Sequence, residues 1–263
     1  MIRQQEQTKE TGGDNMKALD IHGRHAESAF RNAAFAVVPL GSFEYHGPHS
    51  PLGTDFFLAQ GFAGLIDPGL KPLVYPAIPY TACPGKTGDY PGTISIDPAV
   101  FHRYLSDVLE GICRSGFRRI VLLNAHDGNI GASRTVAEEV TSRWKDASFL
   151  LINWWQLAAA DAPEKLGFFQ GTTGRGHGGP YEMSAVKAFR PDLVHVSEED
   201  AELTPPPPLS PMPYVLVEGT PEGWAGYTGH IRQTSLQAGD WIVGEVTANM
   251  NALIANWLGR PAP

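Results

Sequence analysis

The stretch that most constrains the fold runs from Phe35 to Phe57, where an apolar segment passes directly into a loop rich in ionisable side chains. The apolar segment, Ala34 to Leu40, does not alternate with polar residues, which is typical of a strand buried on both faces of a parallel sheet. Glu44 and His46 follow two residues apart, so an extended segment directs both to one side. Asp55 follows a Gly-Thr pair that could start a helix. Glu44, His46 and Asp55 are therefore three candidate ligands for a single metal site.

A second buried strand, Ile120 to Leu123, leads into a polar loop that contains His126. A helix is predicted from about Ile130 to Trp144, and an extended run follows from Phe149 to Asn153. This order is typical of a βαβ unit, which implies a parallel sheet with right-handed crossovers. In such sheets the functional groups lie beyond the carboxyl ends of the strands. We therefore expect His126 and His46 to lie at one edge of an α/β sheet.

Capping residues and 3.6-residue spacing predict the remaining elements. A helix is expected from Ala99 to Arg114 after the Asp97-Pro98 cap, with the stripe Val100, Tyr104, Val108 and Ile112. A C-terminal helix is expected from Asp240 to Leu258, and its packing stripe is Val243, Val246, Met250, Leu253 and Trp257. Two further helices are predicted over 54–66 and 181–189, an amphipathic segment over 21–32 and an extended segment over 73–78.

The length of 263 residues fits one substantial domain. Residues 1–15 are polar and are expected to form a flexible tail, which leaves 16–263 as the domain. The four prolines Pro205 to Pro208 predict an extended surface arm. The loop from Pro79 to Thr93 is long for a compact domain and is expected to contact substrate or act as a lid.

Composition excludes several classes of function. The formal net charge of −8 argues against a nucleic-acid surface, and no apolar run approaches the length of a membrane span. The N-terminus lacks the apolar region of a signal peptide, and Cys83 and Cys113 are expected to be unpaired thiols. We expect a cytoplasmic protein whose partners are a small molecule and other copies of itself.

A third segment completes the pattern, because the glycine-rich stretch Gly171 to Gly179 contains His177 and the next helix begins with Glu182. At this point the sequence resembles the creatininase family of metal-dependent amidohydrolases. The first segment, LGSFEYHGPHSPLGTD, is similar to the leading family motif. Three later segments are also similar to family motifs: Tyr90 to Ile96, Asn124 to Asn129 and His177 to Ser184.

The resemblance implies a single-domain, three-layer α/β/α fold with a mostly parallel central sheet, and a dinuclear metal centre. Carried over by position, Glu44 and His126 would hold one ion, His46 and Glu182 the other, and Asp55 would bridge both. Creatininase proper has a Glu where this chain has Gly128, so Glu182 is the natural replacement and Asp127 a weaker one. The ions would be zinc, with manganese, iron or nickel as alternatives.

Hydrolysis of a carbon–nitrogen bond needs such a set, because two cations make a bridging hydroxide available at neutral pH and polarise the carbonyl. We predict His177 and Glu182 as the catalytic residues, with His177 carrying a proton to the leaving nitrogen. A solvated loop position is the alternative for His177. His49 is expected to brace the loop, with metal binding as the alternative.

The substrate side of the site is less determined. Trp154 and Trp155 resemble the aromatic wall of creatininase, although subunit packing is the alternative. The chain departs from the family at Cys83 to Thr87 and at His230, where an aspartate is usual, so creatinine is disfavoured as the substrate. Further candidate substrate contacts are Asp127 and His230, and the groups available to an anionic substrate are Lys86, Arg175 and His230.

The leading hypothesis is a dinuclear amidohydrolase that acts on a small cyclic amide or a formamide. A family role as peptidase or deformylase in cofactor biosynthesis would use the same ligands. A different class is a catalytically silent, metal-stabilised oligomeric scaffold. The family resemblance implies a homohexamer, whereas the residues themselves indicate only self-association.

Overall fold

A parallel β-sheet forms the centre of the protein. The computed structural model describes residues 15–159, 161–172, 174–204, 217 and 219–261. Its sheet has the strand order β1-β3-β2-β4-β5, and every pair of neighbouring strands is parallel. The strands are β1 (Met16–Lys17), β2 (Phe35–Leu40), β3 (Pro72–Val74), β4 (Arg119–Asn124) and β5 (Ser148–Asn153). The predicted α/β class is confirmed.

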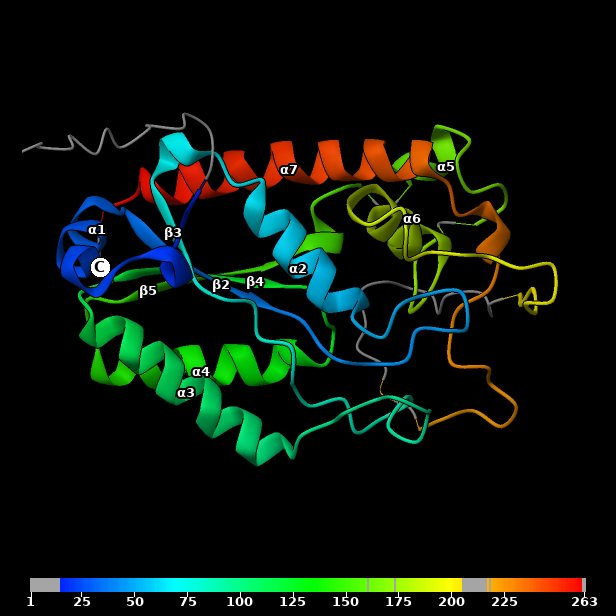
Figure 1. Ribbon diagram of the computed structural model, residues 1–263, viewed down its shortest axis with the longest axis horizontal. Helices are drawn as coiled ribbons and strands as arrows, with labels where there is room; N and C mark the ends of the chain where they lie inside the picture. Colours follow the sequence, from blue (N-terminus) through cyan, green and yellow to red (C-terminus); the bar gives the residue numbers. More distant parts are fainter. Residues whose placement is uncertain (1–14, 160, 173, 205–216, 218, 262–263) are drawn as a thin grey trace, which may run out of the picture.

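Helices cover both faces of the sheet, as Figure 1 shows. One layer contains α2 (Thr54–Gly64), α6 (Pro180–Phe189) and α7 (Leu236–Leu258). The opposite layer contains α3 (Pro98–Arg114) and α4 (Asn129–Arg143). Two short helices, α1 (Ala26–Asn32) and α5 (Ala162–Lys165), complete the set of α-helices in the described ranges. This is the three-layer α/β/α arrangement that we expected.

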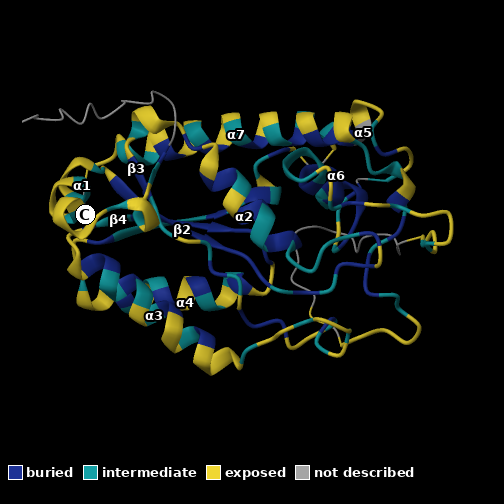
Figure 2. Ribbon diagram, viewed as in Figure 1, coloured by how far each residue is buried: buried dark blue, intermediate teal, exposed yellow. Residues whose placement is uncertain are grey.

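The central strand β2 is buried along its whole length, because its alternate side chains enter two different cores. Phe35 and Val37 pack with the layer of α2, α6 and α7, whereas Ala36, Val38 and Leu40 pack with that of α3 and α4. Figure 2 shows the result as a dark central sheet between helices whose outer faces are exposed. The unbroken apolar run therefore correctly predicted a strand covered on both sides.

The predicted helices exist, with small shifts at their ends, but two predicted stripes are only partly correct. On α3 the buried side chains are Phe101, Leu105, Leu109, Ile112 and Cys113, whereas Val100 and Tyr104 are about half exposed. On α7 they are chiefly Ile242, Val246, Met250 and Ile254, whereas Leu253 is 37% exposed. Each helix carries apolar residues over more than one stripe, so spacing alone selected stripes that are buried only in part.

The capping signal at the start of α3 is confirmed, since the Asp97 carboxylate accepts hydrogen bonds from the backbone N–H groups of Ala99 and Val100 at 2.8 and 3.1 Å. The extended segment predicted from Leu73 shrinks to β3, and Ile78 makes an isolated bridge to Leu40.

Two predicted segments fall largely outside the described residues. Of the expected tail, 1–15, only Asn15 is described; it is buried and its side chain donates to the Ala63 carbonyl at 3.1 Å. The proline arm at 205–208 lies wholly outside.

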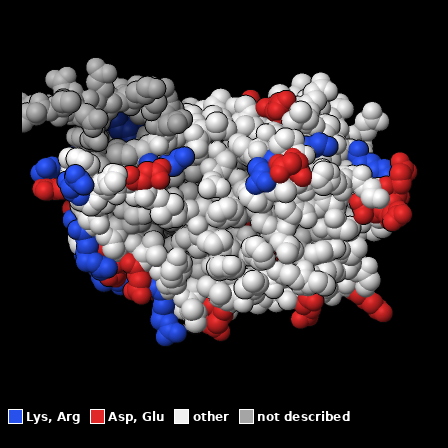
Figure 3. All heavy atoms as spheres, viewed as in Figure 1, with Lys and Arg blue, Asp and Glu red and all other residues white. Residues whose placement is uncertain are grey.

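The described surface carries charged side chains of both signs. On the face shown in Figure 3 the charged side chains lie mostly around the margin, and the centre is largely uncharged. No helix in the described ranges is long and apolar enough to cross a membrane. Cys83 and Cys113 are both buried and unpaired, as predicted.

Candidate metal centre

The register of the sheet brings three loops together at one edge. Leu40 pairs with Asn124, and Asn124 pairs with Asn153, so β2, β4 and β5 end at the same level. Asn124 accepts hydrogen bonds from the His126 backbone N–H and the Asn129 amide at 3.1 and 3.2 Å. These bonds to the Asn124 side chain hold the loop after β4 in place.

Helix α2 approaches the first loop very closely. An added Cβ at Gly41 would lie 2.6 Å from the Phe56 Cα atom, so this contact requires glycine. The approach brings Asp55, in the first turn of α2, back over the loop that contains Glu44, although Asp55 follows Glu44 by eleven positions in the chain. A carboxylate in the first turn of a helix is also favoured by the helix dipole.

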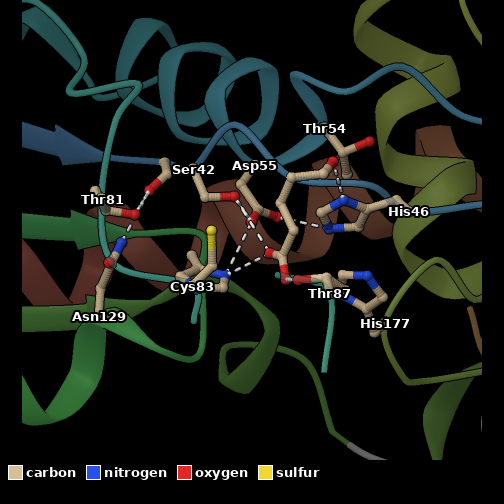
Figure 4. Close-up of polar contacts among 12 residues, drawn as sticks. Ser42, His46, Thr54, Asp55, Thr81, Cys83, Thr87, Asn129 and His177 are labelled. Carbon is tan, nitrogen blue, oxygen red and sulfur yellow. Dashed lines mark hydrogen bonds and ion pairs between the residues drawn. The ribbon is translucent and has the colours of Figure 1, made fainter. Parts of the chain in front are cut away.

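The two oxygens of Asp55 face two different histidines. Asp55 Oδ1 lies 3.2 Å from His46 Nε2, and Oδ2 lies 3.1 Å from His126 Nδ1. On the His126 side Glu44 Oε2 lies 3.0 Å from the same Nδ1, and on the other side Glu182 Oε2 lies 3.8 Å from His46 Nε2. Figure 4 shows Asp55 between Ser42 and His46. The five side chains predicted as ligands thus form one cluster.

These side chains fit metal ions in number and chemistry. Two groups whose ligand atoms lie within 4.8 Å of one another are Glu44, Asp55 and His126, and His46, Asp55 and Glu182. Both groups share Asp55, and both combine imidazole with carboxylate, the ligands that zinc and manganese accept. His46 donates from Nδ1 to the Glu44 carbonyl at 2.9 Å, which leaves Nε2 as the nitrogen directed at the carboxylates.

Without a metal ion, the histidines themselves balance the carboxylates. Burial raises the pKa of Glu44, but the neighbouring His126 lowers it further, to about 2. Burial lowers the pKa of His46, yet Asp55 and Glu182 raise it to about 10. Glu182 behaves differently, because burial raises its pKa to about 7 and His46 only partly opposes this. Such opposed shifts within a few ångströms are typical of functional sites.

His177 lies against the cluster. Its ring stacks on that of His46 with centroids 3.9 Å apart, and its Nε2 lies 2.7 Å from the Tyr45 carbonyl oxygen. Nε2 therefore carries the hydrogen of the neutral ring and Nδ1 is left as an acceptor. Burial, with repulsion from His46, lowers the pKa of His177 to about 4. His177 also forms a third potential ligand group with Glu44 and His46, so its position suits either proton transfer or metal binding.

His49 is not part of the cluster. It is buried, and its Nε2 lies 2.9 Å from the Gly178 carbonyl oxygen. The contact ties the first loop to the segment that carries His177, which agrees with the expected bracing role.

Gly128 lies directly against the His126 ring. An added Cβ at Gly128 would lie 2.5 Å from His126 Nε2 and 3.2 Å from the Ala82 carbonyl oxygen. The observed His126 ring position therefore leaves no room for a residue larger than glycine, and Asp127 is exposed. Glu182 is the carboxylate that lies beside His46 instead.

A cavity of about 720 Å³ opens over the cluster. Its lining includes three of the candidate substrate contacts, Trp154, Trp155 and Asp127, but not the fourth, His230. His230 has a positive φ of 63° and donates its backbone N–H to the Leu203 carbonyl, so the structure does not bring this predicted residue to the site. The predicted role of the loop from Pro79 to Thr93 gains support, because residues 82–87 line the cavity.

Sequence reasoning missed several residues of the site. Trp224 lines the cavity with its ring 5.9 Å from that of His177, and Tyr181 stacks on Trp154. Ser42 donates to Asp55 Oδ2 at 2.6 Å, and Thr87 donates to Glu44 Oε1. Ser42 could have been found from its place directly after a buried strand. Nothing in the local sequence marks Thr87 or Trp224.

A parallel α/β sheet with a buried histidine–carboxylate cluster at its carboxyl edge fits the class of metal-dependent hydrolases. Within this class the chain belongs to the creatininase family, because the family model described as creatinine amidohydrolase matches residues 20–254. It is accordingly an enzyme of the amidohydrolase type.

The curated proteins that the chain matches are named for different activities. Creatinine amidohydrolase of Pseudomonas putida is 28% identical over 189 residues, which cover 68% of this chain and 71% of that protein. The mycofactocin precursor peptide peptidase of Mycolicibacterium smegmatis is 29% identical over 168 residues, which cover 62% of this chain and 60% of that one.

Solved structures agree on the fold. A mutant creatininase complexed with creatine superposes with a TM-score of 0.77 at 22% identity, and the match covers 94% of this chain and all of the other. Other matching creatininase structures include a manganese form and a zinc–zinc form.

Proposed function

We propose that this protein is a dinuclear metal-dependent amidohydrolase that cleaves a carbon–nitrogen bond of a small cyclic amide or a formamide. The observation that carries the proposal is the division of the Asp55 oxygens between His46 and His126. One ion would be held by Glu44, His126 and Asp55, and the other by His46, Glu182 and Asp55. Zinc is the first expectation for both, with manganese, iron or nickel as alternatives.

When bound, the ions would supply an activated water at neutral pH and polarise the carbonyl of the substrate. The chain's own residues complete the chemistry. His177 is neutral at working pH and keeps Nδ1 free of a proton, because its Nε2–H donates to the Tyr45 carbonyl. From this position it can take a proton from the attacking water and pass it to the leaving nitrogen. Glu182, beside His46, is the second predicted catalytic group.

The cavity supports an uncharged, flat substrate. Trp155, Trp224 and Phe101 contribute to a lining that is mainly apolar, and apolar walls with a few polar groups are usual for small-molecule sites. A peptide is the second candidate, because about 720 Å³ is roomy for a single small ring and because one relative is named as a precursor peptide peptidase.

A silent scaffold remains a competing function for the same ligands. It gives no reason for the position of His177, whose ring stacks on that of His46 at the edge of the cavity. We propose further that one domain, 16–263, carries the activity, and that the enzyme is a cytoplasmic homohexamer. Composition and family resemblance support the single domain, the cytoplasmic location and the hexameric state.

The test is a hydrolysis screen of zinc- and manganese-loaded protein. Creatinine, other cyclic amides, formamides and a short peptide would be the substrates, with ammonia, formate or new amino groups as readouts. Chelated protein and Asp55→Asn should be inactive, whereas Asp107→Asn, an exposed change on α3, should retain full activity. Binding of metal without turnover of any substrate in the panel would favour the scaffold.

A further inference from the structure

The second oxygen of the Glu44 carboxylate has its own partner. Glu44 Oε2 faces His126 Nδ1 at 3.0 Å, whereas Oε1 accepts a hydrogen bond from the Thr87 hydroxyl. Ser42 also lies near Oε2, at 3.3 Å, but its hydroxyl makes the shorter contact to Asp55 at 2.6 Å. Because a hydroxyl has one proton to donate, Thr87 is the hydroxyl that fixes Glu44. Figure 4 shows Thr87 in this position beside the cluster.

Thr87 belongs to the segment that forms one wall of the cavity. It is 2% exposed, and the residues before it, 82–86, line the cavity. A tight turn fixes it, with the Tyr90 N–H donating to the Thr87 carbonyl at 3.0 Å. The Thr87 hydroxyl is therefore held in place by the backbone of the cavity wall.

The same loop is attached to the ligand segment a second time. The Tyr90 ring stacks on Tyr45, the residue between Glu44 and His46, with centroids 5.0 Å apart. The Tyr45 backbone N–H donates to the Thr93 hydroxyl at 3.0 Å. Segment 44–46 and loop 79–93 are thus joined again at Tyr90 and Thr93, which both follow Thr87 in the chain. The cavity wall at 82–86 directly precedes Thr87, so a displacement of this wall acts on the Thr87 donor.

We propose that Thr87 is a positioning residue that holds Glu44 in its ligand orientation, and that the cavity loop thereby sets the affinity for the metal ion at Glu44, Asp55 and His126. The inference rests on the proposed function. A hydrogen bond from a neutral hydroxyl to a carboxylate is charge-assisted and directional. Loss of a partner that orients a metal ligand typically weakens metal binding about 10- to 100-fold.

The experiment is a zinc titration of the full chain in competition with a chromophoric chelator. Thr87→Val keeps the shape of the side chain and removes the hydroxyl, and Thr87→Ser keeps the hydroxyl. Thr81→Val is the matched control, because Thr81 is a buried residue of the same loop whose hydroxyl donates to the Gly41 carbonyl at 3.0 Å and to no carboxylate.

We expect Thr87→Val to weaken one of two zinc equivalents about 10- to 100-fold and to leave the other unchanged. Thr87→Ser should restore that equivalent, and Thr81→Val should leave both unchanged. Equal weakening of both equivalents, equal effects of Thr87→Val and Thr81→Val, or no effect of Thr87→Val would each overturn the proposal.

The titration also separates this proposal from the proposed function. Two zinc equivalents that are insensitive to Thr87→Val would refute the role of Thr87 and leave the dinuclear enzyme standing. A selective effect of Thr87→Val in a protein that hydrolyses no amide would support the role of Thr87 and refute the activity. An unsubstituted protein that binds no zinc would refute both.

Discussion

The imidazole of His177 stacks on that of His46, with the ring centroids 3.9 Å apart and the planes inclined by 28°. A proton on His46 therefore opposes a proton on His177, which is one cause of the lowered pKa of His177. The stacking places a neutral imidazole directly beside a metal-ligand candidate. This contact supports the proposed role of His177 as a proton carrier beside the metal centre.

Replacement of His177 by Ala should remove turnover and keep metal content. General acid–base groups contribute about 10²- to 10⁴-fold, so kcat should fall by that order. Metal content by elemental mass spectrometry and turnover would be measured on the same preparation. A loss of metal in His177→Ala would instead identify His177 as a ligand, the role that its grouping with Glu44 and His46 also allows.

Glu182→Gln should lose one of the two ions. The amide of Gln is a weaker ligand than a carboxylate, and the Glu182 carboxylate lies beside His46 but is not grouped with His126. Metal content is expected to fall from about two ions per chain to about one. Glu245→Gln on α7 serves as the control for a loss of charge outside the cluster. Unchanged metal content in Glu182→Gln would contradict the assignment.

Zinc should stabilise the protein more at high pH than at low pH. In the metal-free protein, Asp55 and Glu182 overcome burial and raise the pKa of His46 to about 10. The folded state therefore holds a proton that the unfolded chain loses above about pH 6.5, so this stabilisation is complete below pH 6.5 and is lost as pH rises towards 10.

Burial raises the pKa of Glu182 to about 7, so the contribution of Glu182 to folding stability also falls as the pH rises. Metal binding, by contrast, needs the deprotonated ligands and is favoured as pH rises. Thermal unfolding with chelator or with zinc, measured from pH 6 to pH 8.5, should show a Tm difference that increases with pH. A difference that shrinks over this range would contradict the assigned protonation states.

The corrected packing of α7 predicts which of its side chains stabilise the fold. Met250 is fully buried against the core, so Met250→Ala should lower the free energy of unfolding by about 2–5 kcal/mol. Leu253 is 37% exposed, and Leu253→Ala should cost about 1 kcal/mol or less. Denaturant unfolding of both variants measures the difference. A larger effect at Leu253 would indicate that another copy of the chain covers this face.

Much of the fold could be predicted because its causes are local in the chain. The unbroken apolar run of β2 requires two covered faces, and the βαβ order over 120–153 requires a parallel sheet. The helix cap at Asp97 could also be predicted, since a capping hydrogen bond spans only two or three residues. Among the ligand candidates, Glu44, His46 and His126 stood in loops that follow predicted strands, where a parallel sheet gathers its loops.

What only the tertiary structure decided involves contacts between distant segments. The sequence by itself determined the α/β class, the positions of β2, β4 and β5 and the ligand types, but it did not reveal β1. It could not select the buried stripes of α3 and α7, because both helices have apolar residues on adjacent faces. It could not place His230 outside the cavity or Thr87 against Glu44, because those positions follow from the path of long loops rather than from periodicity. The division of Asp55 between two histidines was likewise fixed by the register of β2 against β4 and by the close approach of α2 at Gly41.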